Sequence, residues 1–219
     1  MRLFPVSTVL GVFVGAAGLF GQGQTAEPKE PPGSQVKGVP PRAAATDYQA
    51  QAKAGDVTIA ADFLGHAIPR MEGPLMTEDY VVVEAGLFGP PGKQITLSIG
   101  DFSLRINGKK QPLPSAPYEL VAKSVKDPQW SPPAPPEKSK SSFGSGSQNE
   151  PPPAPVHMPF EMRRAMAQHL QRTSMPQGEH ALPQAGLLYF QHRGKRENIR
   201  SVELVYASAA GKATLTLQP

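Results

Sequence analysis

Short segments in which apolar and polar residues alternate constrain the fold of this chain more than any other feature of its sequence. Val57–Phe63 (VTIAADF), Gln94–Ile99 (QITLSI) and Phe102–Ile106 (FSLRI) place an apolar side chain at every second position. Because successive side chains of a β-strand point to opposite faces, this period of two predicts strands that bury one face. Further strands are expected at Asp79–Phe88, Ala185–His192, Ile199–Tyr206 and Ala213–Leu217.

Turn residues separate these segments and predict how the strands are joined. Asn107-Gly108 is a strong hairpin signal, because both residues tolerate a positive φ. We expect Lys109–Leu113 to return antiparallel and Tyr118–Val121 to add an edge strand. The pattern favours an all-β fold, an antiparallel β-sandwich of seven or eight strands. Its core is predicted to include Leu104, Leu188, Phe190, Leu204 and Leu215.

The first residues have the composition of an export signal. Arg2 supplies a positive charge, the uncharged run Val6–Phe20 follows, and small residues come next at Gly21, Gly23 and Ala26. This run is shorter than the roughly 20 residues that span a bilayer, so we expect cleavage rather than an uncleaved membrane anchor. The predicted location is exported, either periplasmic or extracellular.

Proline and glycine limit how much of the chain packs into a core. The 26 prolines and 21 glycines are more than a fifth of the 219 residues, which leaves one domain of roughly 100–130 residues. We divide the chain into a signal peptide (1–23), a flexible Pro/Ala-rich tether (24–55), a first part of the sandwich (56–130), a disordered Pro/Ser/Gly-rich insert (131–158), a helix with its linker (159–178) and the last strands (179–219).

One amphipathic helix is expected at Phe160–Arg172. Its apolar stripe includes Met162, Met166 and Leu170 at helical spacing, and arginines occupy the other face. The stripe is short, which favours packing on the chain's own sheet. Contact with a membrane is the alternative for this helix, and for the signal segment if that segment stays uncleaved.

The segment Val81–Leu97 (VVVEAGLFGPPGKQITL) resembles a nucleotide-binding loop only superficially. Five residues rather than four separate Gly86 from Gly92, and Gln94 stands where such a loop has Ser or Thr. A phosphate-binding loop also opens a helix, whereas the alternating residues after Lys93 predict a strand. We therefore expect a strand, a turn and a second strand, with no nucleotide.

The sequence carries no pattern typical of a catalytic, cofactor or metal site. The absence of cysteine excludes disulfides, a thiol nucleophile and a lipid attached at a cysteine. The five histidines lack the spacing of metal ligands, and a net charge of +4 is too mild to indicate nucleic-acid binding. Asp62, Asp79 and Asp101 are expected at strand ends, where an enzyme would require them to converge.

Two basic groups are expected at hairpin tips. They consist of Arg193, Lys195, Arg196 and Arg200 in one connection and Lys109 and Lys110 in another. Charges at such tips usually only face solvent and blunt the end of a sheet. If the tips share one end of the sandwich, they can instead contact an anionic surface such as lipid headgroups or an acidic polymer.

Three segments, Asp79–Lys110, Leu182–Lys195 and Ile199–Leu217, resemble the immunoglobulin-like domains of unknown function found in exported bacterial proteins. The resemblance covers about Asp56–Pro128 and Leu182–Pro219. It implies an immunoglobulin-like sandwich and an extracytoplasmic interaction module without recurrent catalytic residues. The chain departs from the pattern by its long insert and by lacking a lipid-bearing cysteine.

The function expected from the sequence is therefore non-enzymatic. We expect an exported immunoglobulin-like module that binds another component of the cell envelope or extracellular space, either a protein or a polymer. The alternatives are an envelope hydrolase whose acids converge near the insert, and a structural spacer in which the proline-rich segments carry the function.

Overall fold

The computed structural model describes residues 36–132 and 157–219. The chain divides into two units, Met1–Pro31 and Pro32–Pro219, and every described residue belongs to the second. The predicted signal peptide and residues 133–156 of the predicted insert lie outside the described residues. No helix in the described ranges is long and apolar enough to cross a membrane.

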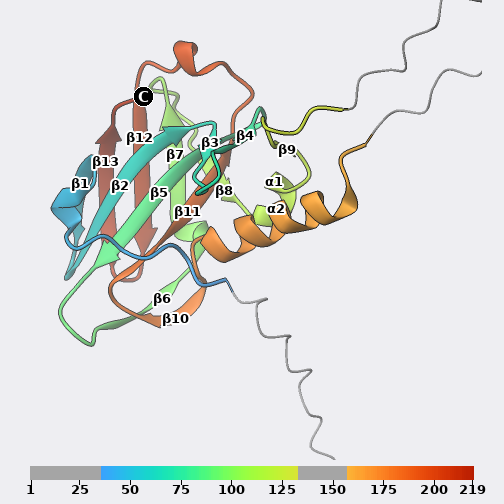
Figure 1. The fold of residues 1–219 in the computed structure, drawn as a ribbon. Helices are drawn as coiled ribbons and strands as arrows, with labels where there is room; N and C mark the ends of the chain where they lie inside the picture. The colour runs from blue at the N-terminus through green and yellow to red at the C-terminus, as the bar shows by residue number, and fades with distance from the viewer. Residues whose placement is uncertain (1–35, 133–156) are drawn as a thin grey trace, which may run out of the picture. The chain divides into compact units, whose positions relative to one another are not determined.

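An eight-stranded antiparallel sheet forms the body of this unit, which confirms the all-β class (Figure 1). Its strands, in spatial order, are β1 (Ala50–Ala54), β2 (Val57–Gly65), β5 (Tyr80–Phe88), β11 (Gln184–Gln191), β8 (Leu113–Ala116), β7 (Phe102–Ile106), β12 (Val202–Ser208) and β13 (Gly211–Leu217). The alternating segments of the sequence account for most of these strands.

The sheet curls until its two edges meet. On one side, short β8 joins β11 and β7 through only two residue pairs each. On the other side, β1 lies against β13 outside the hydrogen-bonded strand order, and the Gln49 side chain donates to the Gln218 carbonyl at 3.1 Å. Two halves of one sheet therefore enclose a single apolar interior.

The interior core consists of the inward side chains of the sheet. Leu104, Leu188, Phe190, Leu204 and Leu215 all lie in it with at most 2% of their surface exposed, which confirms the predicted core. A smaller sheet of β6 (Gln94–Leu97) and β10 (Gly178–Ala181) adds Ile95 and Leu97 to this core. Lys93, which belongs to the segment that resembles a nucleotide-binding loop, is thus followed by strand β6, as predicted.

A second apolar layer covers the outer face of β5 and β11. Val82 and Leu187 point outward from these strands and pack with Leu170 of α2 (Phe160–Thr173) and Val121 of α1 (Tyr118–Val121). The short strands β3 (Ala67–Ile68), β4 (Leu75–Thr77) and β9 (Val125–Lys126) complete the layer. The continuous apolar run of β5 reflects this burial on both faces.

The structure corrects two sequence-based expectations near the hairpin signal. Tyr118–Val121 is a helical turn instead of an edge strand, because extended Pro117 ends β8 and Val121 is buried under α2. Lys109 lies in a loop, since the returning strand begins only at Leu113. Asn107 and Gly108 adopt φ values of 53° and 64°, as the hairpin signal requires.

The expected tether also differs from the structure. Residues 36–54 pack on the sheet: Val39 bridges to Ala185, η1 (Ala45–Asp47) follows, and β1 pairs with β2. The buried Tyr48 ring fixes this segment, because it lies over Gly86, where an added Cβ would be 2.8 Å from the hydroxyl oxygen. The composition of the segment concealed these individual contacts.

Candidate functional site: a basic end of the sheet

Strand register brings the two basic connections to the same end of the sheet. Ile106, the last residue of β7, pairs with Val202, the first residue of β12. Gln191, the last residue of β11, pairs with Tyr80, the first residue of β5. The β7–β8 loop and the β11–β12 loop, which contains η3 (Arg196–Asn198), therefore emerge together, away from β6 and β10 (Figure 1).

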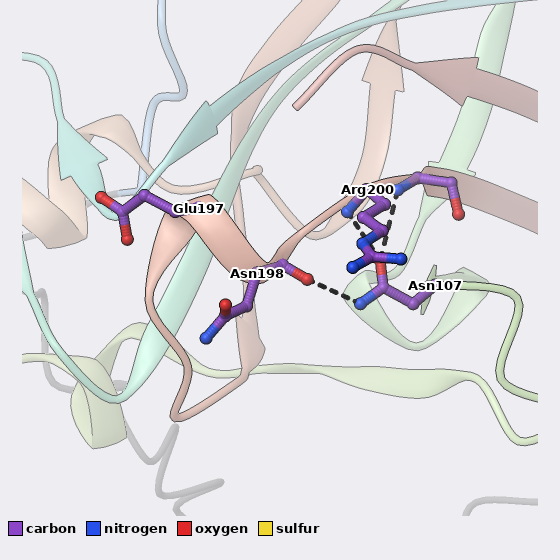
Figure 2. A pocket seen from close by; sticks show the side chains of 5 residues that line it. Asn107, Glu197, Asn198 and Arg200 are labelled. Atoms are coloured by element: carbon purple, nitrogen blue, oxygen red, sulfur yellow. Dashed lines mark hydrogen bonds between the residues drawn. The ribbon is translucent and has the colours of Figure 1, made fainter.

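Asn107 joins these two loops. Its side-chain Nδ2 donates to the Asn198 carbonyl at 2.8 Å, and its Oδ1 accepts from the Arg200 amide at 2.7 Å (Figure 2). The Asn107 amide also donates to the Ser201 carbonyl at 2.9 Å. The residue that makes the hairpin turn thus fixes the position of the neighbouring basic loop, beside a shallow depression of about 520 Å³.

The joined loops concentrate positive charge. Lys109, Lys110, Lys195, Arg196 and Arg200 are exposed, and none of them forms an ion pair within the described part of the chain. We call these five residues the basic end.

The remaining charges near these loops alter this balance little. Arg193, the sixth predicted contact residue, donates to Asp79 at 2.9 Å and is therefore neutralised locally. Glu197 supplies an exposed carboxylate in the same loop. Within residues 36–132 and 157–219, the five unpaired cations of the basic end therefore lie beside one exposed carboxylate, that of Glu197.

Two histidines lie beside the basic end. The rings of His66 and His192 stack with centroids 6.5 Å apart and planes at 23°. Burial, His66 and Lys109 lower the pKa of His192. His66, Lys195 and Arg196 also line a second shallow depression of about 540 Å³. Sequence spacing gave no signal for this pair, because the partners come from opposite ends of the domain.

The acids of the hydrolase alternative do not converge. Asp79 precedes β5 at the basic end, whereas Asp101 precedes β7 at the opposite end, since Phe102 pairs with Tyr206 near the end of β12. Burial raises the pKa of Asp101, and a backbone hydrogen bond at Ser98 partly offsets this. Asp62 lies in the middle of the sheet, opposite Glu84.

Asp62 and Glu84 belong to a structural cluster. Arg42 contacts Asp62 at 2.5 Å and Glu84 at 3.3 Å, and its guanidinium lies 4.2 Å from the centroid of the Tyr48 ring. Asp62 also accepts the Gln49 amide. Both carboxylates are therefore paired with residues of the N-terminal segment, and Arg42 holds this segment against β2 and β5.

The described residues contain no cluster of three or more His, Cys, Asp or Glu side chains able to hold a metal. No family model, no curated protein and no solved structure matches this chain. Function is therefore inferred from the geometry of the basic end.

Proposed function

We propose that this protein is a non-enzymatic, exported binding module whose basic end contacts an anionic component of the cell envelope or extracellular space. The observation that carries the proposal is the convergence of two basic loops, fixed to each other by Asn107. Lys109 and Lys110 come from one loop and Lys195, Arg196 and Arg200 from the other. Such a group attracts a polyanion or an anionic lipid surface more strongly than any of its charges alone.

The form of the site favours an extended ligand over a small substrate. Its depressions are shallow, and the charged side chains stand exposed around them. Small-molecule sites are usually concave and largely apolar, with a few buried polar groups. An acidic polymer or a layer of lipid headgroups instead offers many weak contacts that add up across an open surface.

The immunoglobulin-like relationship is part of the same proposal. The antiparallel pairing and the two halves that face each other across one core support it. The link through β8 makes these halves one continuous sheet, which is a departure from two separate sheets. The predicted export signal supports the location. The spread of Asp62, Asp79 and Asp101 gives the hydrolase alternative no support, and the spacer alternative depends on segments outside the described residues.

A binding comparison tests the proposal. The full chain is mixed with vesicles rich in anionic phospholipid, with neutral vesicles and with soluble polyphosphate, at low and high salt. We expect binding to the anionic probes alone, weakened by salt, because exposed charges are screened. Which anionic probe binds more tightly distinguishes a lipid surface from a polymer.

A matched pair of triple variants shows whether the basic end is responsible. Replacing Lys195, Arg196 and Arg200 with glutamine should weaken binding at least about tenfold, since each basic residue near an anionic surface contributes about 1 kcal/mol. The control replaces Lys53, Lys123 and Lys212, which are exposed outside the two basic loops, and removes the same charge. Equal losses in both variants would mean that net charge alone drives binding, and the proposal would fail.

A further inference from the structure

His66 makes two contacts that a neutral histidine cannot satisfy together. Its Nδ1 lies 2.7 Å from the Tyr80 carbonyl oxygen, and its Nε2 lies 2.7 Å from the Gly194 carbonyl oxygen. Carbonyl oxygens only accept hydrogen bonds, and a neutral imidazole carries a single N–H. The imidazolium ring, with two N–H donors, is therefore the form that satisfies both contacts.

The two carbonyls belong to parts of the fold that differ in burial. Tyr80 begins β5, which is buried on both faces. Gly194 lies in the β11–β12 loop between Arg193 and Lys195, 128 residues from His66 in the chain. His66 thus connects the buried strand β5 to the loop that supplies three cations of the basic end.

Close contacts around Gly194 restrict the position of the β11–β12 loop. A Cβ at Gly194 would be only 2.6 Å from the His192 ring, so the loop backbone lies directly on that histidine. The His192 amide in turn donates to the Asp79 carbonyl at 2.8 Å. His192 therefore holds the start of the loop, and His66 holds its next turn.

The charges around His66 come from four places. The β11–β12 loop contributes His192, Arg193, Lys195, Arg196 and Glu197; the β4–β5 junction contributes Glu78 and Asp79; the β7–β8 loop contributes Lys109; and Lys126 of β9 faces the same junction. Asp79 is paired with Arg193, and Glu78 with Lys126. The surroundings are therefore mainly cationic, and the two carbonyl oxygens are the hydrogen-bond acceptors that the His66 ring contacts.

We propose that His66 is an acid-dependent latch that fixes the β11–β12 loop against the sheet and thereby strengthens anion binding at the basic end. When His66 loses its proton, one contact becomes a lone pair facing a lone pair. The Gly194 contact is the one released, since β5 cannot shift within its two packed layers. The inference rests on the proposed function only for the binding; the ordering of the loop is independent of it.

Nitrogen NMR on the full chain without ligand tests the latch itself, at about pH 5.5 and about pH 7.5, which bracket the usual titration of histidine. We expect both His66 ring nitrogens to be protonated in acid, and the amides of residues 193–197 to become more ordered there. Because the ring signals are read in the unsubstituted protein, this test does not depend on a variant that folds. A His66 with a single N–H at both pH values would overturn the inference.

Vesicle binding with matched variants tests the consequence. For the unsubstituted chain we expect affinity for vesicles rich in anionic phospholipid to rise at least about threefold between the same two pH values, about 7.5 and about 5.5. His66→Gln should bring this ratio close to one, whereas His157→Gln, an exposed histidine before α2, should keep it. A ratio unchanged by His66→Gln would overturn the inference.

The two proposals fail in different ways. Loop ordering that depends on pH, without binding to any anionic probe, would overturn the proposed function and leave the latch standing. Salt-sensitive binding through the basic end, with a loop equally ordered at both pH values, would overturn the latch and leave the proposed function standing.

Discussion

The interior core and the outer layer are built on the same two strands and teach different lessons about this chain. β5 and β11 send one set of side chains, including Val83 and Leu188, into the enclosed interior, and another set outward beneath α2. The interior is completed by regular strands. The outer layer is completed by helix α2, the helical turn α1 and strands of two or three residues, which are joined to the sheet mainly by side-chain packing.

This contrast predicts that substitutions in the two regions change stability in different ways. A defect in the interior affects both halves of the sheet at once, because their inward side chains share one cluster. A defect in the outer layer affects elements that contact one face of β5 and β11. We therefore expect the first to lower global stability and the second to open a local part of the structure.

The largest effect is expected from Phe190→Ala. Phe190 has no exposed surface and lies in the interior core, so truncation should reduce the free energy of unfolding by about 3–5 kcal/mol. Urea denaturation followed by far-ultraviolet circular dichroism, which reports the strands of the sheet, measures this loss. A loss below about 1 kcal/mol would contradict the shared interior, since only a poorly packed site collapses so cheaply.

A smaller and more local effect is expected from Leu170→Ala. Leu170 is fully buried in the outer layer, and truncation should cost about 2–3 kcal/mol. Amide hydrogen exchange should show faster exchange in α2 while β7 and β12 keep their protection. Uniform acceleration across both regions would mean that the two layers unfold as one unit.

Removing the ion pairs that hold the N-terminal segment should reduce the free energy of unfolding by less than either core truncation. Arg42→Gln leaves Asp62 and Glu84 facing each other across β2 and β5 without their cation. The pair is partly exposed, so we expect a loss of about 1–2 kcal/mol that shrinks in high salt. The matched control is Arg105→Gln, which breaks a cross-strand pair with Glu203 on the other half of the sheet. An equal effect in both variants would remove any special role for the Arg42 cluster.

The smallest effect concerns pH. Because the folded chain lowers the pKa of His192, the unfolded chain binds the proton more tightly. The corresponding stability is present above about pH 6.5 and is lost as the pH falls through the lowered folded value. His192→Gln should therefore flatten the decline of stability in that window relative to His157→Gln. Parallel stability curves for the two variants would contradict this assignment.

The sequence predicted the interior better than the outer layer, for a physical reason. Alternation identifies strands with one buried face, and Phe102–Ile106 was predicted with the bounds that the structure has. Tyr118–Val121 carries strand-forming residues, yet tertiary packing against α2 makes it helical. Within residues 36–54, Arg42 and Tyr48 are individual anchors in an otherwise unremarkable composition, and no periodic signal reveals such anchors.

The sequence likewise predicted one part of the candidate site and not the other. Residue type and turn signals identified the basic groups, and only the register of Ile106 with Val202 could show that they share an end. The link from His66 to Gly194 depends on three-dimensional closure across 128 residues, which a single sequence does not encode in its spacing.

The strands of the main sheet form a ring that is closed by hydrogen-bonded pairs everywhere except where β1 meets β13. The β1–β13 edge lies outside the hydrogen-bonded strand order, and β8, on the opposite side of the ring, is held by two residue pairs on each flank. Bending is therefore easiest at β8, and the two halves can part slightly at β1 and β13 without loss of a strand pair. The ring can thus respond to strain by separating at the β1–β13 edge, while the strand pairs within each half stay intact.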